Sequence, residues 1–145
     1  LLSTIKECSK WGLFTRPITD NWGRGRVQLI GDAAHAMVPS VGQGACMAFE
    51  DSYVLGRWMN ACSTPLEAFE NFRKVRIPRV HGVQRLSNSA NKFKHMADQD
   101  KQKAEIKSGN GTHGKIAWVW GFEPEQDWDK VPDNVPEAYR ASASS

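Results

Sequence analysis

The chain has 145 residues, of which 40% are hydrophobic and 24% charged, a balance typical of one globular domain of ordinary size. Its formal net charge of +3 is small and spread along the chain, which argues against a nucleic-acid partner, and no apolar run is long enough to span a membrane. The three cysteines show no paired spacing and the first residues lack a secretory signal pattern, so we expect an intracellular, cytoplasmic setting with reduced thiols.

The first 22 residues have the pattern expected for the end of another domain. Residues 2–8 could form one or two helical turns. Residues 11–18 alternate bulky and polar side chains, which predicts a half-buried strand. Residues 19–25 are rich in turn formers and lead into the next element.

A strand, a loop and a helix are predicted next. Residues 27–30 form a short apolar run ended by Gly31, which is typical of a buried strand. Residues 32–43 contain proline, serine and glycine and read as a loop. Residues 44–59 lack proline and carry apolar residues at helical spacing, so we expect a helix there.

This strand–loop–helix segment predicts a ligand site. Asp32 follows the carboxyl end of the strand, where ligands of open α/β sheets bind. Gly42 and Gly44 flank the helix start, so backbone N–H groups there can approach a ligand, and the positive end of the helix dipole favours an anionic atom. The ligand would be polyhydroxylated and electron-rich. The plainer alternative is that Asp32 caps a loop and the glycines form a turn.

The histidines do not indicate a catalytic or metal site. His35 has no serine or cysteine nucleophile pattern around it, so we expect a packed or hydrogen-bonded residue. His81, His95 and His113 are spaced too irregularly for metal ligands, and no metal is predicted.

Two further features of the predicted helix have simple interpretations. Glu50 and Asp51 are adjacent and point in different directions, so they are not expected to act as an acid–base pair. Cys46 is expected to be a small buried thiol.

A long helical region follows a break at residues 60–64. Thr64 can cap a helix that starts at Pro65, and apolar residues then recur every three to four positions. Pro78 predicts a kink or an interruption, after which residues 79–96 continue the helix. The arginines and lysines of this region could form a phosphate patch, but a solvated helix face is the expectation.

The last third of the chain is less regular. Residues 98–115 are polar and glycine-containing, which predicts a frayed helix end and a mobile loop. Residues 116–122 form a compact aromatic cluster that we expect to pack on the rest of the chain. Residues 123–145 are rich in proline, serine and alanine, which predicts extended structure that needs a partner surface, or disorder.

The stretch GRVQLIGDAAHAMVPSVGQGACMAFED, residues 25–51, closely resembles the second flavin-binding motif of class A FAD-dependent monooxygenases of the para-hydroxybenzoate hydroxylase and salicylate hydroxylase type. The resemblance implies that Asp32, after Gly31, bonds the ribityl chain of FAD and that Pro39, Gly42 and Gln43 line the isoalloxazine ring. It implies that Gly44 and Ala45 face the N1–C2=O end of the ring. Shorter matches at residues 72–79, 83–88 and 116–122 follow in the family's order.

The resemblance also implies a fold and a division of the chain. The fold would be α/β, the C-terminal portion of a Rossmann-like FAD-binding domain with one or two strands plus long helices, incomplete without the N-terminal part. Residues 1–22 would end the substrate-domain sheet and cross back. Residues 23–60 would be the second FAD-binding motif, residues 61–97 the C-terminal helices of the FAD domain, and residues 98–145 a loop, an aromatic segment and an extended tail.

The family's G-x-G-x-x-G on a βαβ unit and its middle D-G motif are not in this chain, so we expect the C-terminal third of such an enzyme, as a fragment, a processed piece or a split-gene product. The implied reaction uses NAD(P)H to reduce FAD. O₂ then forms a flavin hydroperoxide that hydroxylates an aromatic or similar electron-rich small molecule. Its partners would be the organic substrate, O₂ and the N-terminal remainder or a companion chain. No catalytic residue can be assigned within these 145 residues.

Two alternatives remain open from the sequence. The chain could belong to a related FAD epoxidase or reductase that acts on an isoprenoid-type substrate. It could instead be a non-catalytic interaction fragment derived from such an enzyme.

Overall fold

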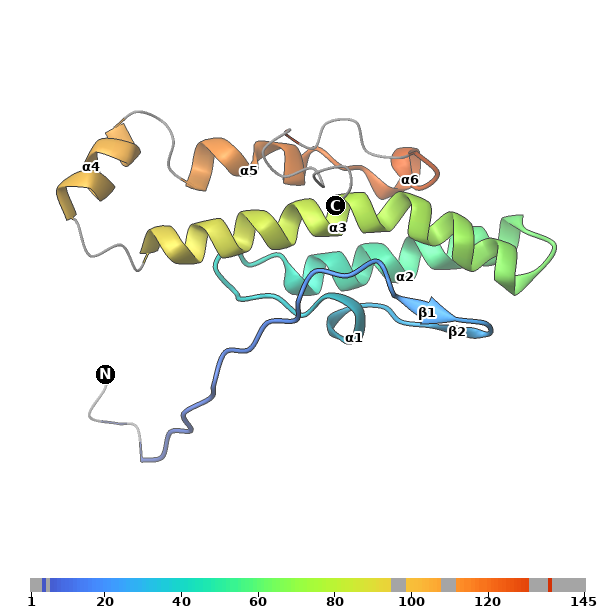
Figure 1. Cartoon of the computed structure of the whole chain (residues 1–145), viewed down its shortest axis with the longest axis horizontal. Coiled ribbons are helices and arrows are strands. Elements are labelled where there is room, and N and C mark those ends of the chain that lie inside the picture. Colours follow the sequence, from blue (N-terminus) through green and yellow to red (C-terminus); the bar gives the residue numbers. More distant parts are fainter. Residues whose placement is uncertain (1–3, 5, 95–98, 108–111, 131–135, 137–145) are drawn as a thin grey trace.

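The computed structural model describes residues 4, 6–94, 99–107, 112–130 and 136. Two long helices, α2 (Gly44–Ala61) and α3 (Pro65–Lys94), lie side by side along the longest axis of the molecule (Figure 1). The short strands β1 (Gly23–Arg24) and β2 (Val27–Gln28) and the one-turn helix α1 (Asp32–His35) precede them. Helices α4 (Gln99–Lys107), α5 (Thr112–Trp120) and α6 (Pro124–Asp127) follow.

The two long helices confirm the predicted helical regions and their break. The hydroxyl of Thr64 accepts a hydrogen bond from the backbone N–H of Glu67 at 3.3 Å, and Pro65 occupies the first helical position, as the sequence predicts. The core lies mainly between α2, α3 and α5. Its large members are buried apolar residues from all three helices and from the segment before β1: Trp22, Met47, Val54, Phe72, Val80, Val83, Leu86, Ile116 and Val119.

The buried strand predicted at residues 27–30 is wrong in length and setting. Only Val27–Gln28 is a strand, and it pairs antiparallel with Gly23–Arg24 in a hairpin whose two-residue turn contains Gly25 at φ +56°. Val27 is 61% exposed. Within the described residues no further strand pairs with β2, and Leu29 and Ile30 are half-buried against the core without being part of a strand.

The half-buried strand predicted at residues 11–18 is also wrong. These residues form neither helix nor strand, and Trp11, Leu13 and Phe14 are exposed. Of the helical turns expected at residues 2–8, residues 2, 3 and 5 lie outside the described part of the chain and residues 6–8 are not helical. Alternating side chains predict a strand only where a neighbouring strand is present to pair with it.

Three boundaries in the middle of the chain differ from expectation. The predicted loop at residues 32–43 opens with α1, and the polar region at residues 98–115 contains α4 and the start of α5. Of the kink or interruption predicted at Pro78, the interruption does not occur, because helix α3 continues through this residue. A proline costs one backbone hydrogen bond, and the packing of α3 against both α2 and α5 offsets that loss.

The aromatic segment packs as expected. Ile116 and Val119 of α5 are buried against the core, and Trp128, just after α6, contacts Trp58 of α2 with ring centroids 4.8 Å apart. At the coarse level, the described residues form a helical assembly with one two-stranded sheet. Within the described part of the chain, no helix is long and apolar enough to cross a membrane.

Candidate functional site

A cleft of about 550 Å³ opens between the α1 turn, the loop after it and the start of α2. Five of the seven site residues predicted from the sequence line it, and Met37 and Ala48 complete the wall; the five are Asp32, Pro39, Gly42, Gly44 and Ala45. The predicted site residues Gly31 and Gln43 do not line the cleft. Gly31 precedes Asp32 in the turn, and Gln43 is the N-cap residue of α2.

Two glycines have backbone conformations that side chains disfavour. Gly31 has φ +57°, and a Cβ atom there would lie 3.3 Å from the Cβ of Ala48 on α2. Gly42 has φ +67°, and a Cβ atom there would have no neighbour within 4 Å among the described residues. Gly31 therefore allows the turn to approach α2 closely, whereas Gly42 keeps the cleft wall open.

The start of α2 is free to receive an anionic group. Among the described residues, no side chain caps it, and its first turn carries no acidic residue. The N–H groups of the first helical turn have no partner within the helix and, with the helix dipole, favour negative charge. The exposed side chain of Asp32, which lines the same cleft, supplies a carboxylate that accepts hydrogen bonds from hydroxyl groups.

Helix α3 holds the loop that forms the cleft floor. The side chain of Gln84 donates to the carbonyl of Ala36 at 3.5 Å, and the hydroxyl of Ser87 donates to the carbonyl of Val38 at 2.5 Å. Upstream, the backbone N–H of Arg16 donates to the same Ala36 carbonyl at 3.2 Å. The loop is therefore fixed from two sides before it reaches Pro39.

A buried charge cluster lies behind the cleft. We use this name for His35, Glu50, Asp51, Arg76 and Arg79. Asp51 accepts hydrogen bonds from the backbone N–H of Gly31 at 3.0 Å, from Nε2 of His35 at 2.6 Å and from Nε of Arg76 at 2.8 Å. Its side chain and those of His35 and Arg76 are fully buried.

The surroundings of Asp51 keep it ionised. Burial alone raises the pKa of this carboxyl, but the hydrogen bond from His35, the charge of Arg76 and the hydrogen bond from Gly31 together outweigh it. The net effect lowers the pKa of Asp51 below its ordinary value. Because an ionised carboxylate can only accept hydrogen bonds, Nε2 of His35 must carry the proton in that contact.

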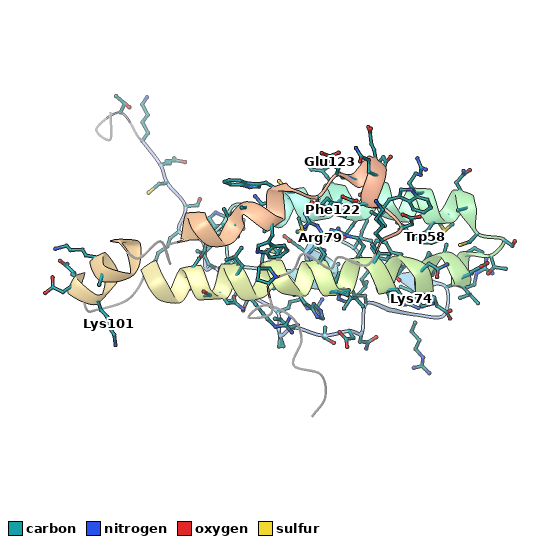
Figure 2. The ribbon with its side chains drawn as sticks, turned by 90° about the horizontal axis from the view of Figure 1, so that it is seen from above. Trp58, Lys74, Arg79, Lys101, Phe122 and Glu123 are labelled. Carbon is teal, nitrogen blue, oxygen red and sulfur yellow. The ribbon has the colours of Figure 1, made fainter. Side chains whose placement is uncertain are left out.

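The second half of the cluster connects α2 and α3 to the C-terminal segment. Glu50 accepts from Arg76 at 2.6 Å and from two nitrogens of Arg79 at 2.7 and 2.8 Å. Arg79 also donates to the carbonyl of Val119 at 2.9 Å, and its guanidinium lies 4.2 Å from the ring centre of Phe122 (Figure 2). The two arginines therefore balance two carboxylates and tie three helices together.

The cluster corrects two expectations. The basic residues of α3 do not all form a solvated face: Lys74 is exposed, but Arg76 and Arg79 are fully buried. Cys46 is exposed rather than buried. The expectation that His35 is a packed, hydrogen-bonded residue is confirmed, and its ring lies 5.2 Å from that of Trp22.

Glu50 and Asp51 share Arg76, but their other partners differ: Glu50 binds Arg79, and Asp51 binds the turn. The sequence did contain a signal for this cluster. The predicted helix at residues 44–59 has two adjacent acids among apolar neighbours, and the next helix has two arginines three positions apart. The two negative charges equal the two positive charges in number. Neither pattern fixes burial, so the pairing is visible only in the structure.

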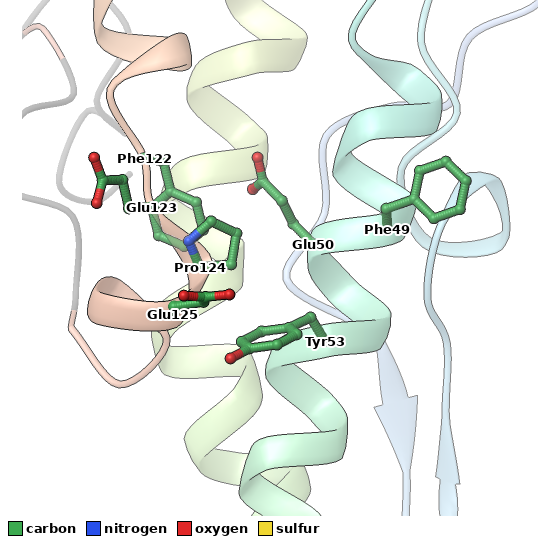
Figure 3. A pocket seen from close by; sticks show the side chains of 7 residues that line it. All are labelled: Phe49, Glu50, Tyr53, Phe122, Glu123, Pro124 and Glu125. Atoms are coloured by element: carbon green, nitrogen blue, oxygen red, sulfur yellow. The ribbon is translucent and has the colours of Figure 1, made fainter.

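A second cavity of about 540 Å³ lies between α2 and the segment that leads into α6 (Figure 3). Glu50 and Tyr53 face it from α2, and Phe122 and Pro124 face it from the other side. Its wall shares Glu50 with the charge cluster, whose arginines already satisfy that carboxylate. It is separate from the cleft at Asp32.

The cleft suits a polyhydroxylated ligand with an anionic end. The carboxylate of Asp32, the uncapped start of α2 and the open backbone at Gly42 are the three features that such a ligand needs. The isoalloxazine, ribityl and N1–C2=O groups of FAD have these properties, so the residues present fit the cofactor that the sequence predicts.

Comparisons with known proteins agree with this geometry. Residues 1–65 match the FAD binding domain family. A 3-amino-4-hydroxybenzoate 2-monooxygenase of Streptomyces platensis is 35% identical over 126 residues, covering 85% of this chain and 32% of that protein. The 3-hydroxybenzoate 6-hydroxylase of Klebsiella oxytoca is 30% identical over 121 residues, covering 80% and 30%.

Two further matches cover less of this chain. The zeaxanthin epoxidase of Solanum lycopersicum is 43% identical over 88 residues, covering 52% of this chain and 13% of that protein. A crystal structure of a variant of Klebsiella pneumoniae HpxO complexed with FAD superposes with a TM-score of 0.57 at 30% identity, covering 62% of this chain and 24% of that one. The chain thus spans about a third of the length of the curated hydroxylase and monooxygenase relatives that it matches. The resemblance predicted from residues 25–51 is confirmed.

Proposed function

We propose that this chain, which is similar to FAD-dependent monooxygenases of the aromatic hydroxylase type, supplies the ring-facing and ribityl-facing part of the FAD site in such an enzyme. In the proposed reaction, NAD(P)H and O₂ are consumed and an aromatic or similarly electron-rich small molecule is hydroxylated. The N-terminal remainder of the same enzyme, or a companion chain, would provide the rest of the FAD site.

The observation that carries this proposal is the cleft at Asp32. Residues that lie up to sixteen positions apart in the sequence, from Asp32 to Ala48, line one cavity, and they include a carboxylate and an uncapped helix start. This arrangement matches a ligand with hydroxyl groups along a chain and negative charge on its ring.

When bound, FAD would supply electron transfer from NAD(P)H and activation of O₂. The chain's own residues would bind and orient it. Asp32 would accept hydrogen bonds from the ribityl hydroxyls, the backbone between Pro39 and Gly44 would lie along the ring, and the N–H groups at the start of α2 would stabilise negative charge on it.

The names of the relatives support a substrate class. The names of two relatives that match most of this chain specify hydroxylated benzoates, so we propose a substrate of that class. The match to zeaxanthin epoxidase is shorter and leaves an isoprenoid substrate as the second candidate.

The test uses the full-length protein that contains this chain. The purified protein should show flavin absorbance, and it should oxidise NADH or NADPH faster when 3-hydroxybenzoate or 3-amino-4-hydroxybenzoate is added. Product analysis with isotope-labelled O₂ should find one labelled oxygen in a new hydroxyl group. A labelled epoxide from a carotenoid would favour the epoxidase, and purified protein that neither contains nor binds FAD would overturn the proposal.

A further inference from the structure

We propose that Asp51 is a positioning residue for the cleft: it holds the Gly31–His35 turn in the shape that presents Asp32 to the ligand. Asp51 touches no part of the cleft itself. The inference rests on the proposed function, because it concerns how the chain prepares an FAD site.

Asp51 binds the turn on both sides of Asp32. Its Oδ2 atom accepts from the backbone N–H of Gly31 at 3.0 Å, one position before Asp32. The same atom accepts from Nε2 of His35 at 2.6 Å, three positions after Asp32. A single buried oxygen atom therefore fixes the two ends of α1, and the exposed Asp32 side chain lies between them.

Asp51 is itself held in place. Arg76 of α3 donates to its other oxygen at 2.8 Å and also donates to the carbonyl of Met47, one turn earlier on α2, at 3.3 Å. The donors around the carboxylate thus come from both the turn and α3, and the side chain has no exposed surface through which it could move.

The histidine depends on this one contact for its orientation. His35 is fully buried against Trp22, and within the described part of the chain its Nδ1 atom has no hydrogen-bond partner. Among those residues Asp51 is the polar anchor of the ring, so loss of the carboxylate removes the contact that joins the ring to α2.

Helix α2 contacts the turn at two positions. Ala48 and Asp51 are three residues apart on one face of α2. Ala48 limits how closely Gly31 can approach, and Asp51 pulls the turn toward the helix. Because the first turn of the same helix lines the cleft, α2 both forms part of the cleft and holds the turn that carries Asp32.

A pair of matched variants in the full-length protein tests the proposal. D51N replaces one carboxylate oxygen by an NH₂ group, and in either orientation that donor faces another donor, from Gly31 and His35 or from Arg76. E50Q does the same on the neighbouring residue, where the described partners are nitrogens of Arg76 and Arg79. Of the two carboxylates, Asp51 is the one that contacts the turn.

We expect both variants to lower the melting temperature, because each leaves a buried arginine poorly paired. Only D51N should also weaken FAD binding, by about tenfold or more. The turn that carries Asp32 would then lose its hydrogen bonds to a charged group. FAD affinity is measured by flavin fluorescence well below both melting temperatures. Equal FAD affinities in D51N and E50Q would overturn the proposal.

A second pair serves if D51N does not fold. H35Q removes the ring bound to Asp51, whereas H81Q removes a buried histidine that also contacts Trp22 but bonds to the carbonyl of Thr19. H35Q should weaken FAD binding more than H81Q, and equal effects would contradict the positioning role. Wild-type protein that binds no FAD would instead overturn the proposed function, and the D32A variant separates the two: it should weaken FAD binding whether or not Asp51 positions the turn.

Discussion

The two faces of helix α2 are built for different purposes. One face carries Met47, Asp51 and Val54, all fully buried against the rest of the chain. The opposite face carries Ala45, Phe49 and Ser52, which are exposed, and Phe49 is 77% exposed. The buried face includes a charged side chain beside two apolar ones, whereas these three exposed residues are small or apolar; an ordinary surface helix has its charges on the exposed face.

This reversal shows how the site is made. The two acidic residues of α2 are directed inward, to Arg76, Arg79 and the turn at Gly31, where they fix geometry. The exposed face is left without side chains that would compete with a ligand at the helix start or with a covering surface. Substitutions on one face at a time separate these two roles.

The largest effect is expected from Arg76→Met on the buried side. This change leaves Asp51 and Glu50 without a shared partner, and removing one member of a buried ion cluster typically costs about 3–5 kcal/mol of the free energy of unfolding. Denaturant unfolding measures it. Lys74→Met on the same helix is the control, since Lys74 is exposed, and it should change stability by no more than about 0.5 kcal/mol.

If both substitutions cost the same, the buried cluster does not stabilise the fold, and the contrast between the two faces loses its basis. Equal costs would mean that other donors replace Arg76 at the two carboxylates. The full burial of Asp51 argues against that outcome, because water cannot reach its side chain without a rearrangement.

Lowering the pH should also destabilise the protein through the buried face of α2. The pKa of Asp51 is lowered in the folded protein by His35, Arg76 and Gly31, so the carboxylate stabilises the fold above its unfolded pKa. That contribution is lost as the pH falls through the lower, folded pKa. Unfolding measured from neutral pH downward should therefore show a steeper loss of stability in the wild type than in D51N, and equal slopes would contradict the shift.

Much of the helical framework could be predicted from the sequence because its causes are local. The break before Pro65, the cap at Thr64 and the apolar spacing of α2 and α3 act within a few residues of where they appear. The residues of the cleft could also be identified from the sequence, since Asp32, the glycines and the helix start form one continuous motif.

What failed depended on partners far along the chain. The runs at residues 11–18 and 27–30 have strand composition, but a strand needs neighbours for its backbone groups, and within the described residues they have at most one two-residue partner. The burial of Arg76 and Arg79 depends on two acids 25 to 29 positions earlier. Local periodicity carries no information on such pairings.

On the cleft side, Asp32→Ala in the full-length protein should weaken FAD binding by about 1.5–3 kcal/mol, because ribityl hydroxyls would lose a charged acceptor. Retention of FAD through gel filtration and the dissociation constant from fluorescence measure the effect. Asp20→Ala removes another exposed aspartate, outside the cleft, and should leave FAD binding unchanged. Identical retention in both variants would exclude Asp32 from the site.

Smaller changes in stability, of opposite sign, are expected when two glycines are replaced by alanine. Gly42→Ala should cost about 1–2 kcal/mol of stability, because φ +67° is unfavourable for any residue with a Cβ, although no described atom lies within 4 Å to clash. Gly56→Ala, in the exposed part of α2 and equally free of contacts with the described residues, should instead stabilise the protein by about 0.5–1 kcal/mol. Thermal unfolding of both variants tests whether the folded protein requires the positive φ at Gly42.

The smallest effect on stability is expected from Phe49→Ala on the exposed face of α2. The ring is 77% exposed, so its removal should change the free energy of unfolding by no more than about 0.5 kcal/mol, whereas Val54→Ala on the buried face should cost about 1–3 kcal/mol.

Phe49 should instead affect the association of the chain with other protein surfaces. Together with exposed Trp11 and Phe14 it offers apolar surface that favours self-association when residues 1–145 are expressed alone. Sedimentation of the isolated chain should therefore show less self-association in Phe49→Ala than in the wild type. A stable monomer in both cases, or a large loss of stability in Phe49→Ala, would show that this face of α2 is an ordinary part of the fold rather than a surface left for a covering partner.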